Sequence, residues 1–425
     1  MSAALFAATA GLVTPAWAAP AAPRQAEPCP YASSSAMCAC YVPSWRTVGG
    51  FPANFTVNTL GGSAELGRVY AGNTDRSASA TREKMFSGRL VDSAWANVVD
   101  MTGNAVADIL GTPDQARVKL WASGEYDRPV FGATAAGPTD FLNQGSLLYV
   151  TRLAAQAGTV FAATGQPAAK GVHAWNEAQG RWDRLGGGSI PTRAFWAFES
   201  GGGWLWLGTD GKGIWSSNDA GANWTQVPGG NSILQATVTA LAIDPRNPNH
   251  MLIGLGPQVD LPTADPKYRG VRETRDGGQT WSNPVFENVD FIPAIVFSRS
   301  NPSRVFATAF GFGIRVSEDG GQTWSAPPSL IPPGAHRNRL YDLLTLVPEG
   351  RPECELLFVG GDGGVWVRNA NSLSGYRAYL PFSQRNHWTL ATPTAAHLDG
   401  HDRAFEHHPS ARATAPAVRP ALPPR

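Results

Sequence analysis

The eight residues at 274–281, TRDGGQTW, decide the fold because two other stretches of the chain repeat their pattern. The related stretches are SNDAGANW at 217–224 and SEDGGQTW at 317–324, so each has the form S/T-x-D-x-G-x-x-W. Their aspartates are 57 and 43 residues apart, a spacing typical of a repeated four-stranded unit. The sequence therefore predicts an architecture of stacked repeats.

The residue types of the repeat predict a turn between two strands. The Asp carboxylate is expected to accept backbone N–H bonds, and glycine to supply a positive φ. The tryptophan is expected to pack between neighbouring units. We assign these structural roles to Ser217, Asp219, Gly221, Trp224, Thr274, Asp276, Gly278, Trp281, Ser317, Asp319, Gly321 and Trp324.

Flanking apolar runs indicate how many units the chain holds. Runs such as VTALAI at 238–243 and AIVF at 294–297 precede the turns, and degenerate copies of the unit occur at 159–182 and 356–367. Residues 45–145 carry no readable repeat but have room for about two more units. Because one blade cannot bury both faces alone, we expect an all-β, single β-propeller of six or seven four-stranded blades.

Composition agrees with a turn-rich β protein and excludes one class of partner. The 425 residues include 47 Gly, 34 Pro and 15 Trp, and 34 Lys plus Arg oppose 33 Asp plus Glu. A net charge of +1 provides no electrostatic footprint for nucleic acid. No run after the first residues approaches the ~18 apolar residues of a membrane span, so none is expected.

The sequence divides into four parts. Residues 1–18 are small and apolar and end in an A-x-A site, which predicts a signal peptide. Residues 19–44 are expected to form a linker and 45–390 the propeller. The proline-rich stretch 391–425 has the composition of a disordered tail. We expect a secreted or periplasmic protein.

The cysteines are consistent with export. Of Cys29, Cys38, Cys40 and Cys354, a Cys38–Cys40 bridge would close a very small loop, so we expect one N-terminal cysteine to pair with Cys354. Which one pairs is left open. No cofactor and no metal site is expected, because the histidines between 397 and 408 lie beside Gly and Pro residues that disfavour a helix.

The three repeated turns resemble the Asp-box, or bacterial neuraminidase repeat. Proteins with this repeat include sialidases, xyloglucanases, the luminal domain of sortilin and the photosystem II assembly factor propellers. The resemblance implies a propeller but not one activity, because function lies in sites carried by the fold. The R-I-P motif of the sialidases is absent from this sequence.

Two other turns resemble the T-D-x-G-G turn of xyloglucanase-like enzymes, whose aspartate is catalytic. They are GTDGKG at 208–213 and GGDGG at 360–364, and they supply Asp210 and Asp362 as candidate catalytic residues. Glycoside hydrolysis uses two carboxylates that flank the scissile bond. The alternative is that both turns are simply tight turns. Three tryptophans are candidates for substrate binding as a platform on which sugar rings stack: Trp204, Trp206 and Trp215. The alternative is that they pack in the core.

Two functions follow from these observations. The first is an exported propeller that binds or hydrolyses extracellular glycans, glycoside hydrolase-like if it is an enzyme. The second is a non-catalytic scaffold that binds an envelope protein. A central face without a facing pair of carboxylates would favour the second.

Overall fold

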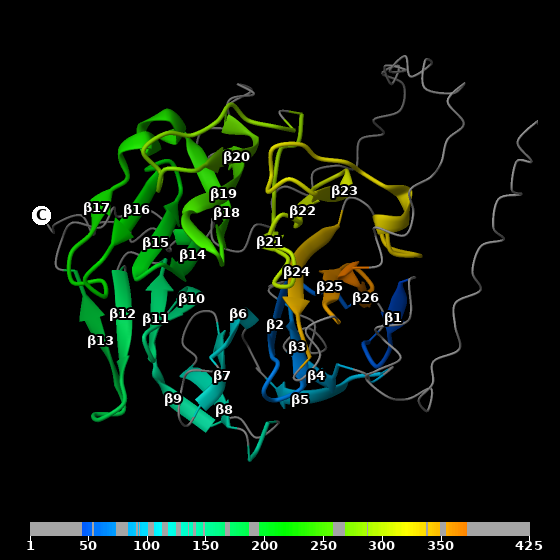
Figure 1. Ribbon diagram of the computed structural model, residues 1–425. Coiled ribbons are helices and arrows are strands. Elements are labelled where there is room, and N and C mark those ends of the chain that lie inside the picture. The colour runs from blue at the N-terminus through cyan, green and yellow to red at the C-terminus, as the bar shows by residue number, and fades with distance from the viewer. Residues whose placement is uncertain are drawn as a thin grey trace, which may run out of the picture.

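The computed structural model describes residues 45–371 except 53–54, 74–83, 91, 93, 101–105, 113–117, 125–128, 135, 139–141, 148, 166–170, 187–194, 258–267, 287, 337–338, 349–353. The signal peptide, linker and tail expected from the sequence lie outside these residues. Antiparallel sheets follow one another around a ring, and the colour runs from blue β2 through green and yellow back to orange β26 (Figure 1). This confirms the all-β propeller and sets the number of blades at seven.

Each blade is a meander that runs from an inner strand to an outer strand. Blades 1 and 2 contain β2 (Thr59–Ser63), β3 (Arg68–Gly72), β4 (Lys84–Arg89) and β5 (Ala96–Asp100), then β6 (Val106–Gly111), β7 (Val118–Gly124), β8 (Pro129–Thr134) and β9 (Leu142–Ser146). Blades 3 and 4 contain β10 (Val150–Gln156), β11 (Thr159–Thr164), β12 (Gly171–Asn176) and β13 (Arg181–Leu185), then β14 (Phe195–Gly201), β15 (Trp204–Thr209), β16 (Ile214–Ser217) and β17 (Thr225–Gln226).

Blades 5 and 6 have three strands each, and isolated bridges take the place of the fourth. Blade 5 contains β18 (Ala236–Asp244), β19 (Asn247–Pro257) and β20 (Gly270–Thr274), and blade 6 contains β21 (Ile295–Phe297), β22 (Val305–Ala309) and β23 (Gly313–Ser317). The bridges join Val271 to Val285 and Val316 to Ser325. Two short 3-10 helices, η1 (Pro228–Ile233) and η3 (Pro328–Leu330), precede β18 and β24.

Blade 7 closes the ring with a strand from the other end of the fold. It contains β24 (Leu340–Leu346), β25 (Leu356–Gly361) and β26 (Gly364–Asn369), and its outer strand is β1 (Arg46–Val48). Val48 pairs with Val365 and Arg46 with Val367, and Figure 1 shows blue β1 beside orange β26. Closure removes the exposed edges that an open stack of sheets would present.

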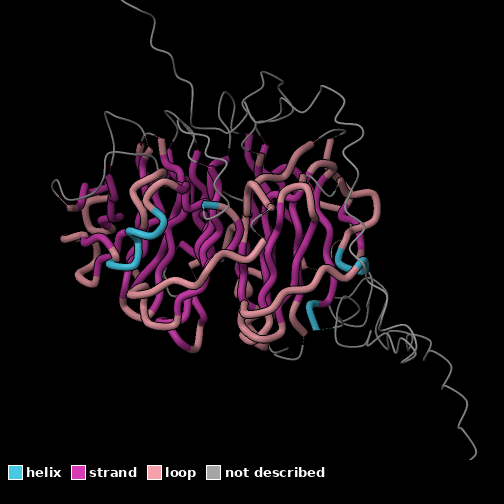
Figure 2. The backbone as a smooth tube through the Cα atoms, turned by 90° about the horizontal axis from the view of Figure 1, so that it is seen from above, coloured by secondary structure: helices cyan, strands magenta, loops and turns pink. Residues whose placement is uncertain are grey.

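The core is divided among the seams between blades. Among the described residues, the buried apolar side chains form one cluster at each of the seven blade–blade seams. In the view turned by 90°, the strands run side by side across the width of the molecule (Figure 2). Each blade is therefore stabilised by its two neighbours, as in other repeat architectures.

The inner strands carry β-bulges near their beginnings. The register shifts lie between Val106 and Asp108 in β6, Val150 and Arg152 in β10, and Leu340 and Asp342 in β24. A bulge re-aims the side chains beside it. In this fold the affected side chains lie around the centre of the ring.

Candidate functional site

The three repeated turns have the same hydrogen bonds. In the turn at 274–281, Thr280 donates its backbone N–H (2.9 Å) and its hydroxyl (2.6 Å) to the Asp276 carboxylate, and Thr274 donates its hydroxyl (2.7 Å). Gly278 has a φ of 84°, a conformation that glycine adopts at little cost. The equivalent bonds recur at Asp219 and Asp319. These carboxylates hold their own turns together.

Their pKa values follow from this bonding. Hydrogen bonds from Thr280 lower the pKa of Asp276 to about 2, and hydrogen bonds from Asn223 do the same for Asp219. For Asp319 burial opposes the shift, but hydrogen bonds from Thr323 and Ser317 lower the pKa to about 2. A carboxylate held ionised in this way is a poor proton donor near neutral pH.

The tryptophans of the three turns pack into the seams. Trp224 is 3% exposed and joins the cluster between blades 3 and 4. Trp281 packs against the cluster between blades 4 and 5, and Trp324 against the one between blades 5 and 6. Each turn thus connects its blade to the preceding one.

Asp210 and Asp362 occupy equivalent positions in two blades. Asp210 follows β15 in blade 4 and accepts a hydrogen bond of 2.6 Å from the hydroxyl of Thr237 in blade 5. Asp362 follows β25 in blade 7 and accepts one of 2.7 Å from Thr56, beside blade 1, and one of 2.8 Å from Arg339. Each carboxylate connects its blade to the next, and two or more blades separate the pair around the ring. Their catalytic role stays a prediction.

The candidate sugar platform lies largely within seams. Trp206 is 5% exposed and belongs to the cluster between blades 4 and 5, with Trp204 packed beside it at a ring distance of 5.9 Å. Trp215 packs against the opposite seam, and its indole N–H donates to the Lys212 carbonyl (3.1 Å). Stacking on a sugar needs an open ring face, which the half-buried Trp204 and Trp215 retain better than Trp206.

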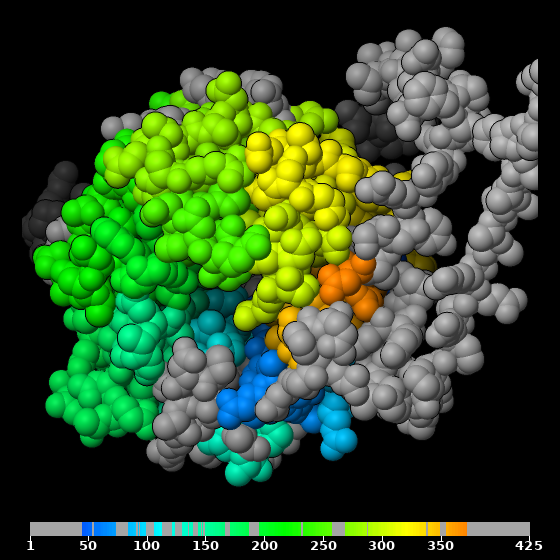
Figure 3. Space-filling model, viewed as in Figure 1, coloured from blue at the N-terminus to red at the C-terminus, as the bar shows by residue number. Residues whose placement is uncertain are grey.

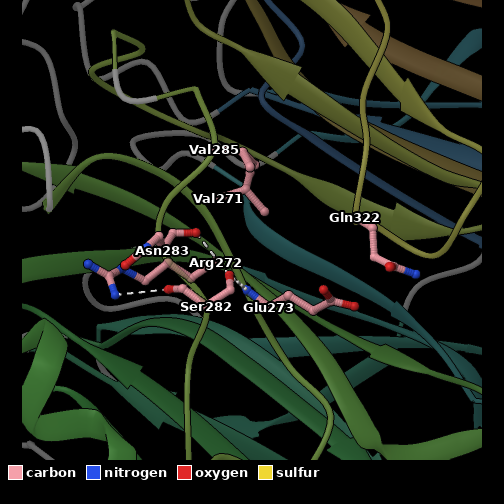
Figure 4. A pocket seen from close by; sticks show the side chains of 8 residues that line it. Val271, Arg272, Glu273, Ser282, Asn283, Val285 and Gln322 are labelled. Atoms are coloured by element: carbon pink, nitrogen blue, oxygen red, sulfur yellow. Dashed lines mark hydrogen bonds between the residues drawn. The ribbon is translucent and has the colours of Figure 1, made fainter.

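A small cavity lies between blade 5 and the repeated turn of blade 6. Its volume is about 180 Å³, and its lining includes Glu273 of β20 on one side and Gln322 on the other (Figure 4). The Arg272 guanidinium donates to the Ser282 carbonyl (3.0 Å) beside the cavity. The cavity is a gap in a seam, far too small for an oligosaccharide.

A charged cluster occupies the centre of the ring. Asp108, Arg152 and Asp342 follow the bulges of the inner strands of blades 2, 3 and 7. Glu199 of β14 interacts electrostatically with all three and with Arg299, which follows β21. Residues from so many blades meet only at the axis, and the space-filling view shows a recess where their segments converge (Figure 3). We call these five residues the channel cluster.

The two aspartates of the channel cluster are engaged in the backbone. The Asp108 carboxylate accepts N–H bonds from Leu153 in the next blade (2.7 Å) and from the next residue of its own strand (3.0 Å). The Asp342 carboxylate accepts N–H bonds from Leu60 in the next blade (2.6 Å) and from the next residue of its own strand (2.8 Å). Both therefore serve as connections between neighbouring inner strands.

Glu199 differs from them. Its side chain is exposed to solvent, and within the described part of the chain its carboxylate has no hydrogen-bond donor. Desolvation by the surrounding protein, followed by repulsion from Asp108, raises its pKa to about 8, while Arg152 and Arg299 oppose the shift. Desolvation also raises the pKa of Asp342 to about 7. Glu199 is thus a carboxyl group available to a ligand, and it carries a proton at neutral pH.

The channel cluster was not predicted from the sequence. Its members lie in inner strands that are far apart along the chain, and no spacing rule connects them before the ring is closed. The available signal was a charged residue inside an otherwise apolar strand, as Glu199 is in FWAFES at 195–200. Charged residues are uncommon in an otherwise apolar inner strand, so Glu199 was a recognisable exception.

Two further findings concern only the described residues. There the structure contains no helix with the length and hydropathy of a membrane span. Nor do three His, Cys, Asp or Glu side chains in this part come together as metal ligands. The histidines between 397 and 408 lie outside it. Cys354 is disulfide-bonded, and the other cysteines, Cys29, Cys38 and Cys40, also lie outside it.

Solved structures resemble this fold at low sequence identity. YCF48 bound to a D1 peptide aligns with a TM-score of 0.52 and 12% identity over 77% of this chain and 99% of that one. The GH74 xyloglucanase from Xanthomonas campestris aligns with a TM-score of 0.56 and 15% identity over 77% of this chain and 54% of that one. The extracellular domain of the hybrid two component system BT4673 from B. thetaiotaomicron aligns with a TM-score of 0.54 and 12% identity. The alignment covers 76% of this chain and 39% of that one.

The chain is a seven-bladed β-propeller. It spans nearly all of YCF48, but about half of the xyloglucanase and two fifths of the BT4673 domain. At these identities the likeness extends to the fold alone. No family profile matches the sequence, and neither does any curated protein. Membership of the Asp-box family in particular stays a prediction.

Proposed function

We propose that this chain is an exported, non-catalytic propeller that binds a segment of another envelope protein at its channel cluster. One observation carries the proposal. Of the three channel carboxyl groups, Asp108 and Asp342 are occupied by backbone N–H groups, and Glu199 alone is open to a ligand. Glycoside hydrolysis needs a pair of carboxyl groups that face each other across the bond. A single open carboxyl group suits binding.

The comparisons support this choice in one respect. YCF48, which the chain spans almost completely, has been solved with a D1 peptide bound. A single propeller of this size is therefore enough to hold a peptide. Glu199, protonated at neutral pH, would both donate and accept a hydrogen bond, while Arg152 and Arg299 would attract acceptors on the partner.

The test compares capture of envelope proteins by three immobilised proteins. We expect a partner that binds the parent and the Glu65→Arg variant, whose change is on the exposed β2–β3 turn, but not the Glu199→Arg variant. Quantitative mass spectrometry of the captured proteins measures the difference. Equal capture by all three would place binding outside the channel cluster and contradict the proposal.

A second candidate is glycan hydrolysis by Asp210 and Asp362. The observation in its favour is their equivalent placement after β15 and β25, at the same end of their blades. The parent protein is assayed on plant, bacterial and sialylated glycans beside the Asp210→Asn and Asp362→Asn variants. Turnover that these variants lose at an unchanged melting temperature would establish a glycosidase and overturn the binding proposal.

A further inference from the structure

An arginine of blade 6 lies between two aromatic rings. Arg315, in the middle of β23, places its guanidinium 5.5 Å from the ring centre of Phe286 and 5.8 Å from that of Phe312. Phe312 belongs to the turn between β22 and β23, while Phe286 comes from blade 5, next to the bridge residue Val285. The arrangement thus spans a seam. We call these three residues the Arg315 bracket.

The guanidinium of the bracket lacks the partner that its counterparts have. Its buried Nε has no hydrogen-bond acceptor, as is also true of the Nε of Arg272. The difference is that, among the described residues, no other nitrogen of Arg315 has a hydrogen-bond or ion-pair partner. Arg272 lies two residues before Thr274, as Arg315 lies two residues before Ser317, and Arg272 donates to Ser282 (3.0 Å). The equivalent Trp215 in blade 4 also has an acceptor, the Lys212 carbonyl. A buried N–H group without an acceptor lowers stability, and a ligand that supplies an acceptor would remove this loss.

Each phenylalanine of the bracket has an uncommon feature, one in its backbone conformation and the other in its exposure. Phe286 has a φ of 63°, which is strained for a bulky residue. Its ring lies against Arg315 and edge-on to Trp324, at a centre distance of 5.4 Å from the Trp324 ring. Phe312 is 39% exposed and is the one large hydrophobic side chain in the described residues to be exposed. Strain and exposed apolar surface are both more common at binding sites than elsewhere.

We propose that the Arg315 bracket binds an acidic side chain of a protein partner, with an apolar neighbour of that side chain resting on Phe312. The guanidinium presents parallel N–H donors that match the two oxygens of a carboxylate. The exposed ring of Phe312 adds an apolar contact next to the charge. A glycan acid fits less well, because Phe286 already has Arg315 on its face and Trp324 at its edge.

The experiment uses two synthetic peptides and one sugar acid. The peptides are acetyl-Gly-Phe-Asp-Asp-Gly-amide and its neutral analogue with Asn in place of Asp, and the sugar is trigalacturonate. Each is titrated into the full-length protein while NMR follows the Arg315 Nε–H resonance. We expect only the acidic peptide to shift this resonance in a saturable way, and to bind at least about tenfold more tightly than the neutral peptide.

Variants assign the effect to the bracket. Arg315→Met removes the guanidinium, retains an unbranched side chain of similar length, and should lose the binding. Arg246→Met removes an exposed arginine of blade 5 and should retain the binding. If Arg315→Met fails to fold, Phe312→Ala serves instead, because the exposed Phe312 ring contributes little to the core. Equal affinity for both peptides, binding unaffected by these changes, tighter binding of trigalacturonate, or no binding would each overturn the proposal. The bracket is separate from the channel cluster, so either site can fail alone.

Discussion

At the scale of single residues, the repeated turns show how a short pattern fixes local structure. Asp276 stays ionised because its oxygens accept bonds from Thr274 and Thr280, all within one turn. Such a pattern is readable in the sequence because donors and acceptor lie within a few residues of each other. Trp281 likewise follows at a fixed distance and reaches the seam.

Replacing Asp276 by Ala should lower stability without affecting binding. The change removes three hydrogen bonds at a largely solvent-exposed turn, so we expect a loss of about 1–2 kcal/mol in the free energy of unfolding. Thermal melting measures it, with Glu65→Ala on an exposed turn as the control. A variant that melts like the parent but no longer binds its ligand would contradict the structural role.

Glu199 should make stability fall as the pH rises. Its folded-state pKa of about 8 lies above the unfolded value of 4.5, so its contribution is full below about pH 4.5 and is lost as the pH rises toward 8. Glu199→Gln imitates the protonated form. Relative to the parent, this variant should therefore gain melting temperature at pH 9 and not at pH 4. The same gain at both pH values, or in Glu65→Gln, would show that the channel environment does not perturb Glu199.

At the scale of elements, what could be predicted depends on how local the determining contacts are. Blades 4, 5 and 6 carry the repeated turn and were recognised from it. Strand β2, with the sequence TLGGS, has no apolar alternation to mark it, so blades 1 and 2 could be inferred only from the available length. Closure by β1 pairs Arg46 with Val367, a contact that no local pattern announces.

Charged substitutions in the closing strand β1 should lower stability on its buried face only. Val48 is 2% exposed in the seam between blades 7 and 1, while the neighbouring Thr47 is exposed. A charge at Val48 would have to be buried or would detach β1 from β26. We expect Val48→Asp to cost about 3 kcal/mol or more and Thr47→Asp less than about 1. Denaturant unfolding measures both, and comparable losses would argue against closure by β1.

The channel cluster and the Arg315 bracket mark the limit of sequence reasoning. Both bring together residues of different blades, and which residues meet depends on the number of blades and on the register of their inner strands. Glu199 and Asp342 are 143 positions apart in the chain yet interact across the ring. The pair Asp210 and Asp362, chosen for similar local turns, is separated by the same ring geometry.

At the scale of the whole molecule, stability is distributed over the seams, and one of them has a covalent addition. Cys354 is disulfide-bonded and lies within the cluster between blades 7 and 1, where β1 also closes the ring. Reduction should therefore weaken the seam that holds the ring shut. We expect a loss of about 2–5 kcal/mol. Melting with and without dithiothreitol measures it, with Cys354→Ala as the variant that should no longer respond. An unchanged melting temperature after complete reduction would contradict this role.

The distribution of tryptophans over the seams gives the molecule built-in reporters. Trp95, Trp121, Trp206, Trp224, Trp324 and Trp366 each lie in or against a different cluster, whereas the described aromatic residues of the cluster between blades 1 and 2 are Tyr70 and Phe131. Opening a seam would bring water to its indole and shift the fluorescence emission to longer wavelength. Single-tryptophan variants could therefore show which seam separates first during unfolding, and the junction of blades 1 and 2 is the one that would need an introduced probe.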